Sequence, residues 1–208
     1  MSYIKRDLEE KINAFNEDYA CILMTGPRQV GKTTVLKKLM TEEREYVTLD
    51  DLEERKLAKN DPAMFLQMHS LPIFIDEVQY APELFSYIKI EIDKGAPASS
   101  FWLTGSQAFK LMELAQESLA GRVAILHMPA LSQHELYGSG SNEPFLLELA
   151  KLKDRKRKGT MATVSEMFER IWHGSLPGHR SGKFKDREVF YSSYVQTFPP
   201  SVTLKMQS

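Results

Sequence analysis

A phosphate-binding loop motif, Gly-x4-Gly-Lys-Thr, occupies residues 26–33 and constrains the fold more than any other stretch of the chain. An apolar run over residues 20–24 precedes the motif, and apolar residues at helical spacing follow it over residues 34–40. Glycines allow the backbone N–H groups of such a loop to point into one concavity, and the following helix adds the positive end of its dipole. The strand–loop–helix context favours a site for a nucleotide polyphosphate over an accidental glycine-rich turn.

Two residues of the motif have specific expected roles. Lys32 is expected to reach the β- and γ-phosphates and to assist their reaction, and the Thr33 hydroxyl is expected to bind Mg²⁺. The residues predicted to bind the nucleotide are those of the loop and the residue after it: Gly26, Pro27, Arg28, Gln29, Val30, Gly31, Lys32, Thr33 and Thr34.

Composition and charge are those of an ordinary soluble chain. Its 208 residues are enough for one domain or one and a half, and 42% of them are hydrophobic and 26% charged. The formal net charge of −1 predicts no general attraction to nucleic acid or to a membrane surface. The single cysteine, Cys21, excludes an internal disulfide and suits a reducing compartment. Because the sequence shows neither an apolar signal core nor a run of membrane-spanning length, we expect a cytoplasmic location without a membrane partner.

Strand-like and helix-like segments alternate between residues 20 and 127. The expected strands are the β-rich or apolar runs at residues 20–24, 45–49, 72–75, 100–104 and 122–127. Helix-forming segments separate these strands, and a further amphipathic helix is expected over residues 4–15. The alternation predicts an α/β fold in which helices cover both faces of a five-stranded parallel sheet.

Polar side chains lie at the ends of two expected strands. Asp76 and Glu77 follow the third strand, and Thr104 and Ser106 end the fourth. Ligands of parallel sheets bind at the carboxyl ends of the strands, where the phosphate-binding loop also lies. Asp76 is therefore expected to hold Mg²⁺ through water, and Glu77 is expected to orient and deprotonate an attacking water molecule. The alternative is that these carboxylates only cap the helix that follows.

The sequence beyond residue 129 is less regular, and we interpret residues 138–160 as a flexible linker. A solvated role for its basic cluster is favoured over nucleic-acid contact, because aromatic stacking partners are missing. His173 and His179 lack further ligands at metal-binding spacing, so we expect structural or surface histidines. The basic cluster consists of Lys151, Lys153, Arg155, Lys156, Arg157 and Lys158.

Five blocks of the sequence resemble, in the same order, a family of bacterial and archaeal AAA-type P-loop ATPases that couple the ATPase domain to a C-terminal domain of unknown function. The blocks are GPRQVGKTT, VTLDD, FIDEVQYAPELF, FWLTGSQAFKLM and ESLAGRVAILHMPALSQHEL, and the resemblance covers roughly residues 1–195. It implies a P-loop NTPase sheet with strand order 5-1-4-3-2 and a Walker B motif at Asp76 and Glu77. It also implies ATP rather than GTP, which agrees with the lack of a guanine-reading Asn/Thr-Lys-x-Asp motif in the sequence.

The resemblance also assigns residues outside the loop. It implies a polar sensor on the fourth strand, which Thr104, Ser106 and Gln107 match. It further makes Arg122 a candidate for sensing or neutralising the γ-phosphate. Because Arg122 starts the fifth expected strand, opposite the nucleotide edge, we expect it to act on ATP bound by a neighbouring subunit of a homo-oligomer. The alternative is a surface arginine paired with a carboxylate such as Glu117.

Residues 198–208 depart from the pattern of this family. They show no helical period and contain adjacent prolines where family members continue with a helical segment. We therefore expect an AAA-type ATPase domain at residues 1–137, the linker at 138–160, and a partial, helical start of a truncated C-terminal domain at 161–208.

The expected function is that of a Mg²⁺-dependent ATPase that acts as a conformational switch on an unknown target. Two alternatives stay open. One is a truncated nucleotide-binding remnant without useful turnover. The other is a nucleotide kinase, which is disfavoured because no segment presents an arginine-rich lid convincingly. Nucleic acid is a further partner that the sequence neither shows nor excludes.

Overall fold

The computed structural model describes residues 3–106, 108–138, 146–158 and 162–197. The chain divides into two compact units, of which the first is Lys5–Ala130 and contains the phosphate-binding loop. The second unit contains Ile4 and the described residues from Leu131 onward. The domain boundaries expected at residues 137 and 160 stay predictions.

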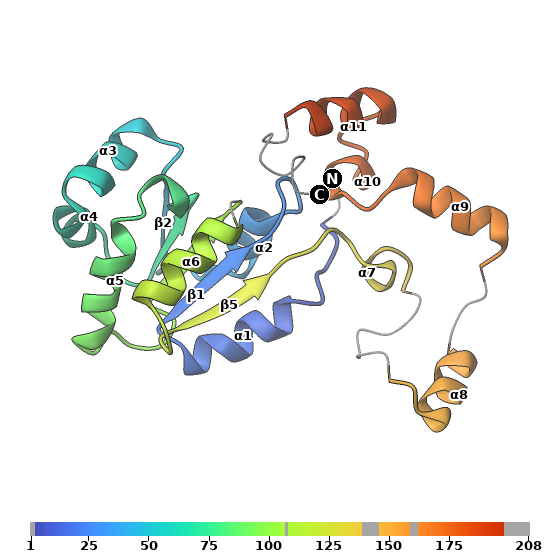
Figure 1. Ribbon diagram of the computed structural model, residues 1–208, viewed down its shortest axis with the longest axis horizontal. Helices are drawn as coiled ribbons and strands as arrows, with labels where there is room; N and C mark the ends of the chain where they lie inside the picture. Colours follow the sequence, from blue (N-terminus) through green and yellow to red (C-terminus); the bar gives the residue numbers. More distant parts are fainter. Residues whose placement is uncertain (1–2, 107, 139–145, 159–161, 198–208) are drawn as a thin grey trace, which may run out of the picture. The chain divides into compact units, whose positions relative to one another are not determined.

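Five parallel strands of the first unit form a sheet in the order β2-β3-β4-β1-β5 (Figure 1). This is the order 5-1-4-3-2 read from the other edge, so the predicted α/β fold and strand order are confirmed. Every neighbouring pair is parallel, and the carboxyl ends of the strands therefore lie along the same edge. The strands are β1 (Cys21–Thr25), β2 (Glu45–Thr48), β3 (Ile73–Asp76), β4 (Phe101–Gly105) and β5 (Val123–His127).

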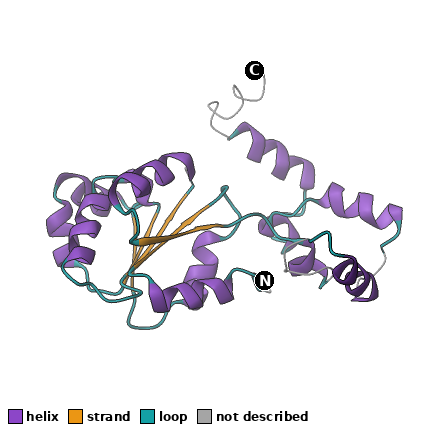
Figure 2. Ribbon diagram, turned by 60° about the horizontal axis from the view of Figure 1, so that its bottom comes forward, coloured by secondary structure: helices purple, strands orange, loops and turns teal. Residues whose placement is uncertain are grey.

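Helices cover both faces of the sheet, as Figure 2 shows. Successive strand residues point to opposite faces, so Leu23, Ile75 and Leu103 share one face. These side chains join a fully buried apolar core with residues of four helices. The helices are α3 (Leu52–Asn60), α4 (Pro62–Met68), α5 (Leu84–Asp93) and α6 (Ala108–Ser118).

The other face of the sheet carries α1 (Glu9–Asp18) and α2 (Lys32–Leu39). There Trp102 Nε1 donates to Asn16 Oδ1 at 2.7 Å. The first helix begins at Glu9 rather than at residue 4, where the periodicity placed it. The prediction was wrong because Arg6 bonds elsewhere: its backbone N–H donates to the Glu9 carboxylate at 2.7 Å, and its guanidinium bonds to the phosphate-binding loop.

Turn chemistry sets the start of α4. Asp61 Oδ1 accepts a hydrogen bond from Met64 N at 2.9 Å, and Pro62 is the first helical residue. Both residues suit these positions, because aspartate satisfies a free N–H donor and proline has none to satisfy.

The described part of the second unit is helical. All six residues of the basic cluster, which was predicted to belong to a flexible linker, lie within the helix α8. The His179 ring stacks on those of His173 and Phe190, with centroid separations of 5.9 and 6.0 Å, which agrees with a structural role. The helices are α7 (Gln133–Tyr137), α8 (Leu149–Lys158), α9 (Val164–His173), α10 (Pro177–Arg180) and α11 (Arg187–Gln196).

Some expectations fall on residues outside the described ranges. These are residues 139–145 and 159–160 of the predicted flexible linker, the sensor residue Gln107 and the irregular end at 198–208. Across the described ranges, no helix combines the length and the apolar character that crossing a bilayer requires.

Candidate nucleotide-binding site

The loop between β1 and α2 turns through three residues with positive φ. The φ angle is 142° at Gly26, 62° at Gln29 and 95° at Gly31. A Cβ atom at Gly26 would overlap the carbonyl oxygen of Met128, so both the backbone angle and the close approach require glycine. Gly31 directly precedes α2, whose first N–H groups have no acceptor within the helix and can bind an anion. The predicted strand–loop–helix arrangement is confirmed.

The side chains of the loop differ in exposure. Val30 is fully buried, so its side chain is not available to a nucleotide. Gly26 and Lys32 are also buried, and Gly31 and Thr33 are half-buried. The exposed residues of the loop are Pro27, Arg28, Gln29 and Thr34.

A buried arginine holds the loop. Arg6 is only 3% exposed, and its Nη1 and Nη2 atoms donate to Val30 O and Pro129 O, both at 2.8 Å. The guanidinium therefore ties the loop to the segment that follows β5. No sequence pattern separates Arg6 from its exposed neighbour Lys5, so this role could not be inferred from the sequence.

Lys32 folds back onto the loop. Its Nζ donates to Gly26 O at 3.0 Å and to Pro27 O at 2.8 Å, and the residue is 7% exposed. Burial lowers the pKa of Lys32 below its usual value, while the carboxylates of Glu77 and Asp76 oppose this shift. An ammonium group in this position is well placed to exchange carbonyl oxygens for phosphate oxygens.

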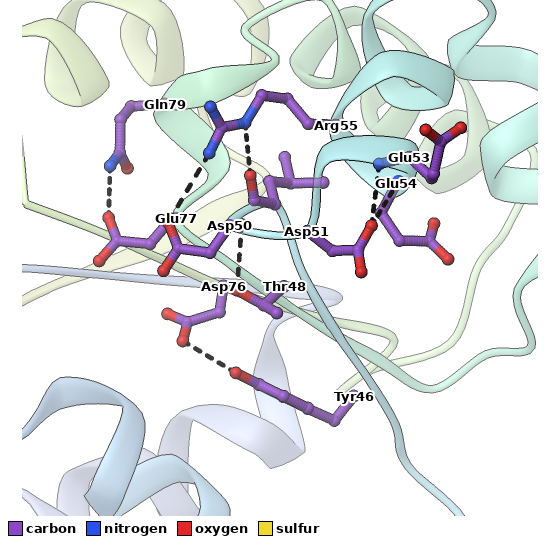
Figure 3. Close-up of polar contacts among 11 residues, drawn as sticks. Tyr46, Thr48, Asp50, Asp51, Glu53, Glu54, Arg55, Asp76, Glu77 and Gln79 are labelled. Carbon is purple, nitrogen blue, oxygen red and sulfur yellow. Dashed lines mark hydrogen bonds and ion pairs between the residues drawn. The ribbon is translucent and has the colours of Figure 1, made fainter.

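Asp76 is the centre of a hydrogen-bond network at the end of β3. Thr33 Oγ1 lies 2.9 and 3.1 Å from the two carboxylate oxygens. The Thr104 hydroxyl donates to Oδ1. Tyr46 Oη donates to Oδ2 at 3.1 Å, as Figure 3 shows. The structure thus brings together the two predicted metal-binding residues, Thr33 and Asp76.

The donor set at Thr33 and Asp76 fits Mg²⁺. The described residues contain no group of three or more His, Cys, Asp or Glu side chains that could hold a metal. A single carboxylate beside a hydroxyl is instead typical of Mg²⁺, which keeps several waters and takes further oxygen ligands from a phosphate substrate.

Tyr46 is a site residue that the sequence did not reveal. Its pKa is raised to about 12, first by burial and then by the Asp76 carboxylate, so the hydroxyl keeps its proton at neutral pH. Lys37 of α2 places Nζ 3.5 Å from the centroid of the Tyr46 ring. Tyr46 reaches Asp76 because β2 pairs with β3, and only the strand order could have indicated this.

Glu77 directly follows β3 with a left-handed backbone, at φ 57° and ψ 42°. Its side chain makes no capping bond to the short 3-10 helix η1 (Val78–Tyr80) that follows, so the helix-cap alternative is wrong for this carboxylate. Instead, Nε2 of Gln79 donates to Glu77 Oε2 (Figure 3).

The predicted sensor residues at the end of β4 lie beside this network. Thr104 is fully buried, and its hydroxyl is engaged with Asp76. Ser106 is half-buried, and Gln107 lies outside the described residues. Whether these residues contact a nucleotide stays a prediction.

Arg122 lies away from the residues described above. It precedes β5, whose first residue pairs with Cys21 at the start of β1, whereas the loop follows the end of β1. Its Nε lies 2.6 Å from Asp93 Oδ1, so the carboxylate partner is Asp93 rather than the predicted Glu117. Both side chains of this ion pair are more than a third exposed.

Comparisons with known proteins agree with this geometry. A model of the AAA domain family matches residues 18–137, more than half of the chain. The uncharacterized proteins Mb2031c of Mycobacterium bovis and Rv2008c of Mycobacterium tuberculosis are each 32% identical over 145 residues. The matched part covers 68% of this chain but 32% of theirs, so the chain spans about a third of the length of these relatives.

Among solved structures, the chain is similar to the Walker-type ATPase paby2304 of Pyrococcus abyssi. The TM-score is 0.56 at 17% sequence identity, and the match covers 99% of this chain and 75% of that one. At this level of identity the likeness supports the P-loop ATPase fold. The family match, the fold and the arrangement of Lys32, Thr33 and Asp76 lead to one conclusion: the chain belongs to the AAA domain family, with a nucleotide-binding, ATPase-like role.

Proposed function

We propose that this chain binds ATP together with Mg²⁺ at residues 26–34 and hydrolyses it to ADP and phosphate. The observation that carries the proposal is the contact between Thr33 Oγ1 and the Asp76 carboxylate, at 2.9 Å. It joins the phosphate-binding loop to the end of β3, which are the two segments that hold Mg²⁺ in P-loop ATPases. Membership of the AAA domain family supports the same function.

Lys32 binds phosphate by exchanging partners. Lys32 now donates hydrogen bonds to the carbonyl oxygens of Gly26 and Pro27, which are neutral. Phosphate oxygens carry charge and make stronger hydrogen bonds. Bound phosphate also raises the pKa of Lys32 and so opposes the effect of burial. Phosphate binding therefore favours the charged form of the lysine.

Thr33 and Asp76 would hold the metal, the threonine through Oγ1 and the carboxylate through water. A magnesium ion held by these residues would supply positive charge that neutralises the negative charge developing on the phosphate groups. Tyr46 and Thr104 donate to the Asp76 oxygens and fix the orientation of that carboxylate.

Glu77 is the proposed base. It follows Asp76 directly at the carboxyl end of β3, which lies on the same edge of the parallel sheet as the loop after β1. A carboxylate in this position can accept a proton from the water that attacks the γ-phosphorus atom. The proton then resides on Glu77 until it exchanges with solvent.

Hydrolysis would serve as a conformational switch. Because the chain spans 32% of the curated relatives, the target, a homo-oligomeric state and any contact with nucleic acid remain proposals for the whole protein. A nucleotide-binding chain without useful turnover is the rival hypothesis. Its distinguishing property is tight ATP binding without phosphate release.

Calorimetric titration with ATP, with and without Mg²⁺, tests the binding step. Lys32→Ala removes a charged donor worth about 2 kcal/mol, so ATP affinity should fall roughly 30-fold. Lys38→Ala is the matched control, because Lys38 is an exposed residue of the same helix. Equal affinities in the parent and Lys32→Ala would contradict the assignment of the loop.

Steady-state phosphate release then separates the hydrolase from the binding protein. GTP added as a competitor tests the preference for ATP. Candidate acceptor nucleotides test the kinase alternative, which predicts a phosphorylated acceptor in place of free phosphate.

A further inference from the structure

Gln79 contacts Glu77 from within the short helix η1. The residue is 5% exposed, and its Nε2 donates to Glu77 Oε2 (Figure 3). We propose that Gln79 is a positioning residue, which holds the Glu77 carboxylate on the side of the phosphate-binding loop. The inference rests on the proposed hydrolysis, in which Glu77 acts as the base.

The orientation of the Gln79 carboxamide follows from its partner. An ionised carboxylate only accepts hydrogen bonds, so the NH₂ group must face Glu77 and the oxygen must point away. That oxygen, Oε1, is buried and has no hydrogen-bond partner in the described part of the chain. An unpaired buried acceptor is unfavourable, and a side chain with a purely structural role would avoid it by being apolar. The donor bond to Glu77 accounts for an amide at this position.

Gly105, at the end of β4, makes room for the carboxamide. A Cβ atom there would overlap Gln79 Oε1, so the amide can occupy its place only beside a glycine. The preceding residue, Thr104, donates to Asp76. Adjacent residues of β4 therefore support the two carboxylates differently: Thr104 fixes Asp76 directly, and Gly105 admits the side chain that fixes Glu77.

The position of Glu77 makes such support necessary. Its backbone lies in the left-handed region, which is unusual for a residue with a side chain, and the carboxylate is only half-buried. Among the described residues, Gln79 is the one whose side chain donates a hydrogen bond to this carboxylate.

Gln79→Met tests the proposal, because methionine keeps the length of the side chain and removes both the donor and the unpaired oxygen. We expect kcat to fall about ten- to a hundredfold, as for a displaced catalytic group, with KM for ATP within about twofold of the parent. The thermal midpoint should stay the same or rise. Gln67→Met, at an exposed position of α4, is the matched control and should leave all three quantities unchanged.

A second measurement does not depend on turnover. In ¹⁵N-labelled protein, the side-chain amide signal of Gln79 is identified by its absence in Gln79→Met. This signal should move in Glu77→Gln, because the anionic acceptor is lost. If the parent shows no phosphate release above the Lys32→Ala background, the proposed hydrolysis fails, and the amide signal still decides whether Gln79 holds Glu77.

Three results would overturn the inference. The first is parental kcat in Gln79→Met. The second is a fall in kcat that only follows a fall in the thermal midpoint, since that would indicate a structural role. The third is an amide signal of Gln79 that does not move in Glu77→Gln, whatever the turnover.

Discussion

Replacing Arg6 with methionine should weaken both the stability of the fold and its affinity for ATP. The guanidinium is almost fully buried and makes two hydrogen bonds of 2.8 Å, to Val30 O and Pro129 O. Hydrogen bonds from a charged donor contribute about 1.5–3 kcal/mol each. The apolar part of methionine recovers some of this by burial, so we expect a net loss of about 3 kcal/mol.

This magnitude is large enough to measure. For a chain of this size, about 3 kcal/mol corresponds to a thermal midpoint lowered by roughly 6–12 °C. ATP affinity should fall about tenfold, because a loop that is no longer fixed must be ordered when the nucleotide binds. Urea unfolding followed by circular dichroism gives the free energy of unfolding, and calorimetric titration gives the affinity.

Lys5→Met is the matched control. The side chain of Lys5 is 71% exposed and its ion pair with Glu10 spans 3.8 Å, so its loss should cost well under about 1 kcal/mol. Equal free energies of unfolding in Arg6→Met and Lys5→Met would show that the buried hydrogen bonds of Arg6 do not stabilise the fold. An Arg6→Met variant that is destabilised as expected but binds ATP like the parent would also refute the reasoning, because the arginine would then support the fold without organising the loop.

Three further predictions concern the loop, the metal site and Arg122. Gly26→Ala should lower the free energy of unfolding by about 2 kcal/mol or more, because a Cβ atom meets Met128 O and φ is 142°; parental stability in urea would contradict this. Tyr46→Phe removes one donor to Asp76, so the Mg²⁺ concentration that half-saturates ATP binding should rise about fivefold, whereas Tyr87→Phe, at an exposed tyrosine, should leave it unchanged. Arg122→Ala should change stability by less than about 1 kcal/mol, because its ion pair is exposed, and should lower turnover per molecule only at protein concentrations where oligomers form; turnover equal to that of the parent at every protein concentration would contradict a catalytic role for Arg122.

The features that follow from local sequence were predictable. The motif at residues 26–33 specifies its own backbone geometry, because its glycines occupy positions where φ is positive. Alternating strand-like and helix-like segments were enough to predict a parallel sheet with helices on both faces. The strand order came from the family resemblance. The position of Asp76 at the same edge of the sheet as the loop followed from its place at the carboxyl end of a parallel strand.

The contacts that support the site were not predictable in the same way. Arg6 is one of several charged residues in its segment, and nothing in the neighbouring sequence indicates that it is buried against Val30. Tyr46 reaches Asp76 only because β2 pairs with β3. Gln79 resembles any polar residue of a short helix until the room left by Gly105 is known. Each of these roles depends on segments that are far apart in sequence, and periodicity carries no information about them.

The same limit explains the partner of Arg122. Its position at the start of the fifth strand was predicted, and the strand begins one residue later, at Val123. The choice between Glu117 and Asp93 depends on how the end of α5 lies beside that strand. The carboxylate nearer in sequence was the natural expectation. The structure instead pairs Arg122 with the last residue of α5.

The central claim is that residues 26–34, Asp76 and Glu77 form a site that hydrolyses Mg²⁺-bound ATP. Single-turnover phosphate release from the parent and from Glu77→Gln tests it most directly, with ATP affinity measured on the same samples. Glutamine keeps the shape of the side chain and its bond with a neighbouring amide, but it cannot accept a proton from water. For Glu77→Gln we expect an ATP affinity close to that of the parent and phosphate release slowed about a hundredfold or more. Parental phosphate release in Glu77→Gln would contradict the central claim.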